Sequence, residues 1–305
     1  MVKKQSPVRK TSKITAIIAI ISVAIIATIV LSYYFIDLLN NPPSTIISSN
    51  NRGLDKFGIK EIYPTMVGGR EWFINMDNPK NDGIFNPESP ITRQPDGSWQ
   101  IEGRHKIGKY NEEVRMNVNT TAGDKQWKNV EITGYAKVVQ ANPPNDSLDW
   151  YARGIRHNSK VPCEGTSLKG IIYIDGTVEW KKEIWHTGGY TDARDKSKVT
   201  DSILGRWIGW KVVMYNINND TAVKMESYID DKNNNNWRKV TDLIDDGSWY
   251  ANSPDNIFYS ANCGKPKDYI VTNTGPVVTF RSDNMIWDFK DLSVREIQPP
   301  SPPKH

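Results

Sequence analysis

Short metal-binding and nucleophile motifs are missing from this chain of 305 residues. Three of its four histidines, His105, His157 and His186, come from distant segments and show no short zinc spacing. The stretch DDKNNNNW (230–237) resembles the start of a calcium loop. It lacks the glycine and the later glutamate of an EF-hand, so a polar hairpin tip explains it better. No G-x-S-x-G elbow supports a serine nucleophile. The sequence therefore predicts neither a metal site nor a cofactor.

An excess of charge of one sign is also missing, except at the N-terminus. The chain has 39 Lys and Arg against 35 Asp and Glu. Five of the basic residues precede position 14: Lys3, Lys4, Arg9, Lys10 and Lys13. The rest of the chain therefore has 34 Lys and Arg. Because nucleic-acid binding normally requires a basic patch, the sequence predicts no nucleic-acid partner.

One long hydrophobic run is present, near the N-terminus. Residues 14–36, ITAIIAIISVAIIATIVLSYYFI, carry no charge, and about 20 apolar residues suffice to cross a bilayer. The pattern predicts a cytoplasmic segment (1–13), a transmembrane anchor (14–39), a Pro/Ser/Asn linker (40–52) and an extracytoplasmic remainder. The alternative is a cleaved signal peptide, whose apolar core would be only about 7–15 residues long. We therefore expect a single-pass protein of the cell membrane.

Cysteine is scarce, and both cysteines follow the predicted anchor. An extracytoplasmic compartment is oxidising, so Cys163 and Cys263 are expected to form a disulfide. The alternative is a pair of buried free thiols.

Beyond the linker, the hydrophobic pattern is that of β-strands. Apolar and polar residues alternate in VEITGYAKVV (130–139), WKVVMYNI (210–217), VKMESYID (223–230) and VVTFRSDN (277–284). Turn signals such as QPDGSW and DDGSW separate such runs. Since neither a second linker nor an internal repeat is evident, the sequence predicts one all-β domain over 53–297, followed by a Pro-rich tail (298–305).

The chain resembles the concanavalin A-like lectin/glucanase superfamily, in particular its jelly-roll polysaccharide lyases and their non-catalytic relatives. The resemblance covers most of 70–297 and is carried by WKNVEITGY, IIYIDGTVEWKKEIWH, ESYIDDKNNNNWRKVTDLIDDGSW and FRSDNMIWDFKDLSVREI. It implies a jelly-roll β-sandwich of two curved antiparallel sheets, one of which forms a groove for an extended glycan. The glycosidase strand E-x-D-x-x-E and the Gln-x-His triplet of alginate-cleaving lyases are absent.

The segment DWYARGIRHNSK (149–160) contains candidate ligand-binding residues. On a strand, Tyr151, Arg153 and His157 would share one face, and Arg156 would lie on the other. Arginine can bind a carboxylate with two hydrogen bonds, and histidine titrates near neutral pH. The segment either binds a carboxylated sugar, or its arginines pair with structural carboxylates.

The segment KKEIWHTGGYTDAR (181–194) is a second candidate. If it continues a strand, Lys181, Glu183 and Trp185 share one face and would form a polar groove floor with an aromatic platform. His186 would end this strand, with Tyr190 just beyond the following glycines.

A β-elimination lyase needs a group that neutralises the uronate carboxylate, a base for the C5 proton and an acid for the leaving oxygen. His157 or His186, together with Tyr190 and Arg153, would meet these needs. The alternative is that His186 and Tyr190 only hold a long loop in place.

Other polar and aromatic residues are candidates for ligand contacts. Glu131 and Tyr135 lie on the polar face of the strand 130–139, which is either groove floor or outer solvent face. Trp180 and Trp249 could stack on sugar rings, and His105 could lie at a groove edge.

Three functions follow from these patterns. The first is a membrane-anchored domain that recognises carbohydrate, with anionic polysaccharide as the expected ligand. The second is a lyase that cleaves uronate polymers, which would require His157, His186 and Tyr190 to converge in one groove. The third is a structural protein of the cell envelope.

Overall fold

The computed structural model describes residues 53–103, 113–121, 123, 125–141, 146–154 and 161–300. The predicted cytoplasmic segment, transmembrane anchor and linker lie outside this part of the chain. No helix among the described residues is long and apolar enough to cross a membrane.

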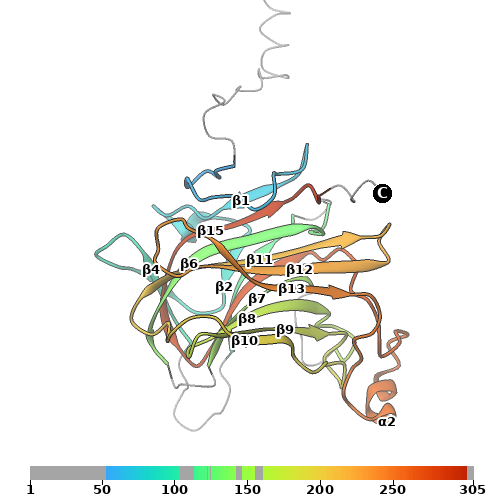
Figure 1. Cartoon of the computed structure of the whole chain (residues 1–305). Helices are drawn as coiled ribbons and strands as arrows, with labels where there is room; N and C mark the ends of the chain where they lie inside the picture. Colours follow the sequence, from blue (N-terminus) through green and yellow to red (C-terminus); the bar gives the residue numbers. More distant parts are fainter. Residues whose placement is uncertain are drawn as a thin grey trace, which may run out of the picture. The chain divides into compact units, whose positions relative to one another are not determined.

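The described residues form the predicted all-β sandwich, in which two antiparallel sheets pack face to face (Figure 1). The eight-stranded sheet has the order β13-β12-β11-β6-β15-β4-β3, and β1 also pairs with β15. Its strands are β1 (Glu71–Phe73), β3 (Ile91–Arg93), β4 (Trp99–Glu102), β6 (Val130–Gln140), β11 (Trp207–Ile217), β12 (Ala222–Asp230), β13 (Arg238–Asp245) and β15 (Ile286–Glu296).

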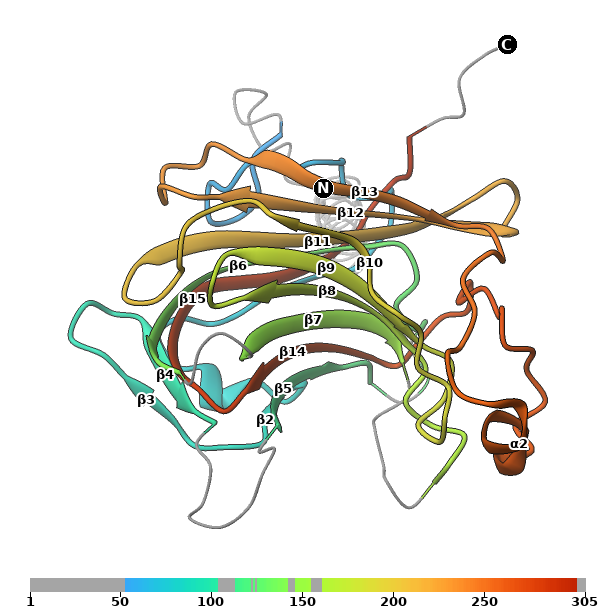
Figure 2. The same cartoon turned by 60° about the horizontal axis from the view of Figure 1, so that its bottom comes forward.

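The seven-stranded sheet has the order β10-β9-β8-β7-β14-β5-β2. Its strands are β2 (Phe85–Pro87), β5 (Glu113–Asn119), β7 (Ser147–Gly154), β8 (Ser167–Tyr173), β9 (Thr177–Glu183), β10 (Arg194–Lys198) and β14 (Val277–Asp283). Figure 2 shows the curvature of its central strands. Short helical turns complete the described part: η1 (Pro79–Asn81), α2 (Asp255–Phe258) and η2 (Tyr259–Ala261).

The core lies between the sheets because alternate residues of each strand are apolar. Trp150 on β7, Trp210 on β11 and Phe280 on β14 are fully buried there. The sheets approach closely at Gly170, where an added Cβ would lie 2.7 Å from Val212 Cγ2. The outward face of each sheet is not part of this core, so its residues can be polar or charged.

The outward face of the eight-stranded sheet is covered by residues 53–66, which we call the covering segment. Its Ile59 packs in an apolar cluster with Tyr135 and Trp237. The backbone N–H of Ile62 donates to Glu131 Oε2 (3.0 Å), and the Tyr63 hydroxyl donates to Glu226 Oε2 (2.8 Å). The part of this face around Glu131, Tyr135 and Glu226 is therefore buried rather than exposed to solvent or ligand.

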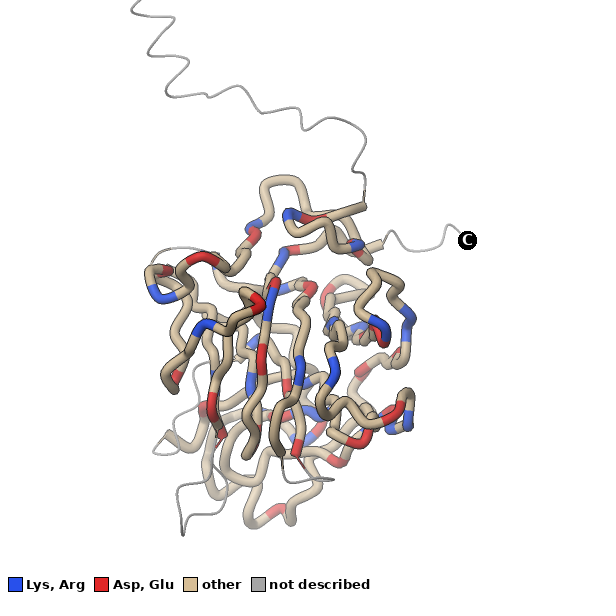
Figure 3. The backbone as a smooth tube through the Cα atoms, turned by 90° about the vertical axis from the view of Figure 1, so that its left-hand side faces the viewer, with Lys and Arg blue, Asp and Glu red and all other residues tan. Residues whose placement is uncertain are grey.

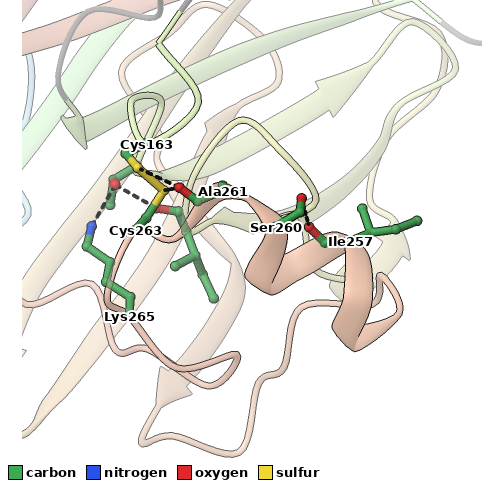
Figure 4. The surroundings of a disulfide bond; sticks show 8 residues. Cys163, Ile257, Ser260, Ala261, Cys263 and Lys265 are labelled. Carbon is green, nitrogen blue, oxygen red and sulfur yellow. Dashed lines mark hydrogen bonds between the residues drawn. A yellow bond between two sulfur atoms is a disulfide. The ribbon is translucent and has the colours of Figure 1, made fainter.

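The predicted disulfide between Cys163 and Cys263 is confirmed (Figure 4). Its Cα atoms lie 5.4 Å apart, and it joins segments separated by 100 residues. The bridge connects the loop that precedes β8 to the chain that follows η2.

Candidate functional site

The outward face of the seven-stranded sheet carries a groove of about 370 Å³. Strands β5, β7, β8, β9 and β14 line it, together with Tyr190 from the loop after β9. The lining side chains are predominantly polar or charged: Glu113, Ser147, Asp149, Lys169, Ile171, Tyr173, Lys181, Lys182, Glu183, Tyr190, Arg281 and Asp283. The strand period of two explains this set except for Lys182, since most alternate residues of the same strands are apolar and face the core.

Lys169 and Glu183 form the least exposed ion pair with both side chains on this face. Lys169 Nζ lies 2.6 Å from Glu183 Oε2, and the side chains are only 7% and 2% exposed. The ammonium also lies 5.4 Å from the ring centroids of both Tyr151 and Tyr190, which favours cation–π attraction. The other oxygen, Glu183 Oε1, is buried beside His186 and Tyr190.

His186 and Tyr190 meet beside this pair. The Tyr190 hydroxyl lies 3.2 Å from His186 Nδ1, which in turn lies 3.9 Å from Glu183 Oε1. Burial and the Glu183 carboxylate raise the pKa of the Tyr190 phenol, so this group stays protonated near neutral pH. Two of the four predicted catalytic residues are thus brought together at the groove.

The far end of the groove is a network of arginines and carboxylates. Arg281 Nη2 contacts Glu113 Oε1 (2.8 Å), and its Nε contacts Asp283 Oδ1 (2.7 Å). Arg115 bonds Glu113 as well, and its Nε donates to the Tyr151 hydroxyl (3.1 Å). Burial opposes ionisation of Glu113, but the two guanidinium groups outweigh it and lower its pKa. For Asp283, burial prevails and raises the pKa.

The loop that carries His186 and Tyr190 is fixed by backbone hydrogen bonds. His186 N–H donates to the carbonyl of Glu164 (2.8 Å), next to the disulfide, and Gly189 N–H donates to the carbonyl of Trp185 (3.1 Å). Gly189 fits a tight turn, because an added Cβ would lie 2.5 Å from Trp185 N and O. The disulfide therefore supports the position of this side of the groove.

The predicted face of Lys181, Glu183 and Trp185 is only partly formed. Lys181 and Glu183 line the groove, as expected. Strand β9 ends at Glu183, so the alternation does not reach Trp185, which is 1% exposed and packs on Phe258 at 4.3 Å between ring centroids. Trp185 is therefore a core residue and not an aromatic platform.

The other candidate platforms are also buried. The indole N–H of Trp180 donates to Thr241 Oγ1 (2.8 Å) inside the sandwich, and that of Trp249 donates to the carbonyl of Asp192 (2.9 Å). The aromatic ring that borders the groove with substantial exposure (37%) is instead that of Tyr190.

Arg153 does not face the groove, although Tyr151 does. The pairing of β7 with β14 shifts between Tyr151 and Gly154, and Arg153 has a φ of 70° at this irregularity. Its guanidinium is fully buried and donates to the carbonyl of Val271 (2.8 Å) and to Asn216. Burial lowers its pKa. Its role is structural, which corrects the prediction of a uronate-binding arginine.

Three further predicted residues, His105, Arg156 and His157, lie outside the described residues. Their predicted roles therefore stay predictions.

Glu131 and Tyr135 belong to the outward face of the other sheet. Glu131 is buried between Lys211 (2.8 Å) and Arg295 (3.0 Å), while the Tyr135 hydroxyl donates to Asp230 Oδ2 (2.9 Å). Both lie beneath the covering segment, so neither forms a groove floor or an open solvent face.

Several groove residues were not singled out from the sequence. They are Glu113, Asp149, Lys169, Arg281 and Asp283 in the lining, and Arg115 just outside it. A signal was present, because Lys169 interrupts the apolar run SLKGIIY and Arg281 lies on the polar face of VVTFRSDN. The sequence does not show that these strands are neighbours in one sheet.

Comparison with known proteins gives no match to a family model and no match to a curated protein. The chain is similar to solved structures at low sequence identity. The exoplasmic/lumenal domain of VIP36, in a calcium- and glycan-bound form, shares 10% identity at a TM-score of 0.45, covering 76% of this chain and 90% of that chain.

Two further structures are similar over a comparable length. Alginate lyase Aly36B, in complex with an alginate trisaccharide, shares 12% identity at a TM-score of 0.39, covering 77% of this chain and 98% of that chain. The carbohydrate-binding module CBM66 from Bacillus subtilis shares 8% identity at a TM-score of 0.38, covering 70% and 97%. A fold alone does not define the chemistry of a groove, which depends on the side chains that line it.

Proposed function

We propose that this domain binds carbohydrate in the groove on the outward face of the seven-stranded sheet. One observation carries the proposal. The groove combines fixed hydrogen-bonding groups with an exposed tyrosine ring, because Lys169, Glu183 and Tyr190 meet at one place. A sugar offers hydroxyl groups to such donors and acceptors and an apolar ring face to the tyrosine.

Titration of the full-length protein with a panel of neutral and uronic oligosaccharides tests this proposal. Tyr190→Ala should weaken the binding of any bound glycan at least fivefold, equivalent to about 1 kcal/mol. Tyr250→Ala is the matched control, because Tyr250 is 58% exposed but does not line the groove. Equal losses in both variants, or none in Tyr190→Ala, would contradict the proposal.

A second candidate function is a lyase for anionic polysaccharide, and the contact between His186 and Tyr190 favours it. Tyr190 is protonated near neutral pH and would donate its proton to the leaving oxygen at C4, although its raised pKa makes it a weaker acid than an ordinary phenol. His186, 3.2 Å away, would accept the C5 proton, and the electron pair of that bond would form the C4=C5 double bond.

Ultraviolet absorbance of the unsaturated uronate tests this candidate directly. Rising absorbance that is lost in both Tyr190→Phe and His186→Ala would support a lyase. If no uronate polymer of a full panel gives an absorbance change, the lyase candidate is rejected. If the protein also binds no glycan at all, a structural role in the cell envelope explains it better.

We further propose that residues 14–39 span the cell membrane and hold the domain on its extracytoplasmic side. The apolar run and the basic residues before it support this placement. The disulfide is compatible with an oxidising compartment. Protease added to intact cells should remove the domain, whereas resistance to protease until lysis would contradict this placement.

A further inference from the structure

We infer that the groove selects neutral glycans over uronate-containing ones, an inference that rests on the proposed carbohydrate binding and argues against the lyase candidate. The inference follows from how the charges in and around the groove are paired. Figure 3 shows Lys and Arg positions interspersed with Asp and Glu positions along the backbone of the described residues.

Every cation that lines the described part of the groove already has a carboxylate partner. Lys169 pairs with Glu183 (2.6 Å), Lys181 with Glu179 (2.9 Å) and Arg281 with Glu113 (2.8 Å). The fourth cation, Lys182, has its ammonium turned into the core, where it pairs with Asp245 (2.8 Å) and both side chains are fully buried.

The cations just outside the lining are paired in the same way. Arg115 bonds Glu113, and Lys196 Nζ lies 3.1 Å from Glu179 Oε2. A uronate carboxylate would therefore have to compete with one of the protein's own carboxylates, and Glu179 and Glu183 are almost fully buried. A buried carboxylate that loses a cation partner loses part of its compensation for desolvation.

The carboxylates that line the groove also favour a neutral ligand. Asp149 and Asp283 line it together with Glu183, whose Oε2 is occupied by Lys169. A sugar hydroxyl can donate to a carboxylate oxygen, and hydrogen bonds to ionised acceptors are among the stronger ones. A uronate carboxylate cannot donate, and it would be repelled by Glu183, Asp149 and Asp283.

The test compares each uronate oligosaccharide with its carboxyl-reduced form, in which only the carboxylate at C6 is replaced by a hydroxymethyl group. Mannuronan, glucuronan and galacturonan oligomers supply three such pairs, and the full-length wild-type protein is titrated with all six ligands. In any pair that binds, the neutral member should bind at least about tenfold more tightly. Its affinity should change less than about twofold between low and high salt, since no ion pair forms with the ligand.

Tighter binding of a uronate member that weakens with salt would overturn the inference and leave the proposed carbohydrate binding intact. Retention of neither member of any pair would instead contradict the proposed binding itself, and the inference with it. The two failures are therefore distinguishable without any variant.

A substitution provides a second test, in which the binding of uronate oligomers should become tighter. Glu183→Gln removes the carboxylate that occupies Lys169, so uronate oligomers should bind at least about fivefold more tightly than they bind the wild type. Glu226→Gln is the matched control on the other sheet, because Glu226 is equally buried (2% exposed) and pairs with Lys239 at the same 2.6 Å. An unchanged uronate affinity in a folded Glu183→Gln protein would contradict the assigned role of this ion pair.

Discussion

At the scale of single residues, the charged groups of the two outward faces serve different purposes. Beneath the covering segment, Glu131 is fully buried and contacts both Lys211 and Arg295. In the groove, Glu183 is almost as buried, but its partner Lys169 and the neighbouring Tyr190 line an open groove. The first network stabilises the fold, whereas the second can also contact a ligand.

We expect Glu131→Gln to lower the free energy of unfolding by about 3–5 kcal/mol, because it removes the carboxylate that contacts buried Lys211 and leaves Arg295 with Glu61 alone. Glycan affinity should not change, since Glu131 lies on the face opposite the groove. Chemical denaturation and glycan titration of the same variant check both expectations. Lost binding with unchanged stability would place Glu131 in the ligand site after all.

The stability cost of Glu131→Gln should depend on pH. Burial opposes ionisation of Glu131, but Lys211 and Arg295 outweigh it, so the pKa is lowered from its ordinary value of 4.5. The carboxylate therefore contributes fully above the unfolded-state pKa, and its contribution is lost as the pH falls through the lowered pKa of the folded state. Denaturation curves at several pH values should show a constant difference between variant and wild type above about pH 5, and a shrinking one below about pH 4. A difference that grows on acidification would contradict this assignment.

At the scale of elements, the loop after β9 decides where His186 and Tyr190 lie. The sequence pattern correctly predicted the alternation of β9 as far as Glu183. The end of the strand was not predictable, because it depends on the packing of Trp185 against Phe258, 73 residues further along the chain. Arg153 was misplaced for a similar reason, since a shift in strand pairing leaves no signature in a single sequence.

We expect Gly189→Ala to disturb this loop. The new Cβ would lie 2.5 Å from the backbone of Trp185, so the turn must shift and move Tyr190. Glycan affinity should fall at least about fivefold, and stability by about 1–3 kcal/mol. Gly83→Ala is the control, because a Cβ there meets nothing within 4 Å. Unchanged affinity in Gly189→Ala would show that the loop is not part of the binding site.

The disulfide is the second element-scale feature. We expect Cys163→Ser/Cys263→Ser to lower the free energy of unfolding by about 2–5 kcal/mol, because the bridge closes a loop of 100 residues. Binding should weaken as well, since the carbonyl beside Cys163, that of Glu164, accepts the backbone N–H of His186. Thermal unfolding and titration measure the two effects. A loss of stability without any change in affinity would show that the disulfide does not support the position of the groove residues.

At the scale of the whole molecule, the two sheets have one covered and one open outward face. The alternation of strands, the all-β class and the disulfide were predictable because they depend on local pattern and on cysteine number. The covering segment was not, since nothing in residues 53–66 indicates that they lie across β6, β11 and β12. For this reason the polar face of Glu131 and Tyr135 could not be distinguished from the groove by sequence alone.

Hydroxyl-radical footprinting of the full-length protein with a saturating neutral oligosaccharide tests the central claim most directly. Tyr190 is exposed at the groove, whereas Tyr250 and Tyr259 are exposed away from it. The account predicts that the ligand protects Tyr190 from oxidation and leaves Tyr250 and Tyr259 unchanged. Protection of Tyr250 or Tyr259 alone, or of Leu54 in the covering segment, would contradict carbohydrate binding on the seven-stranded sheet.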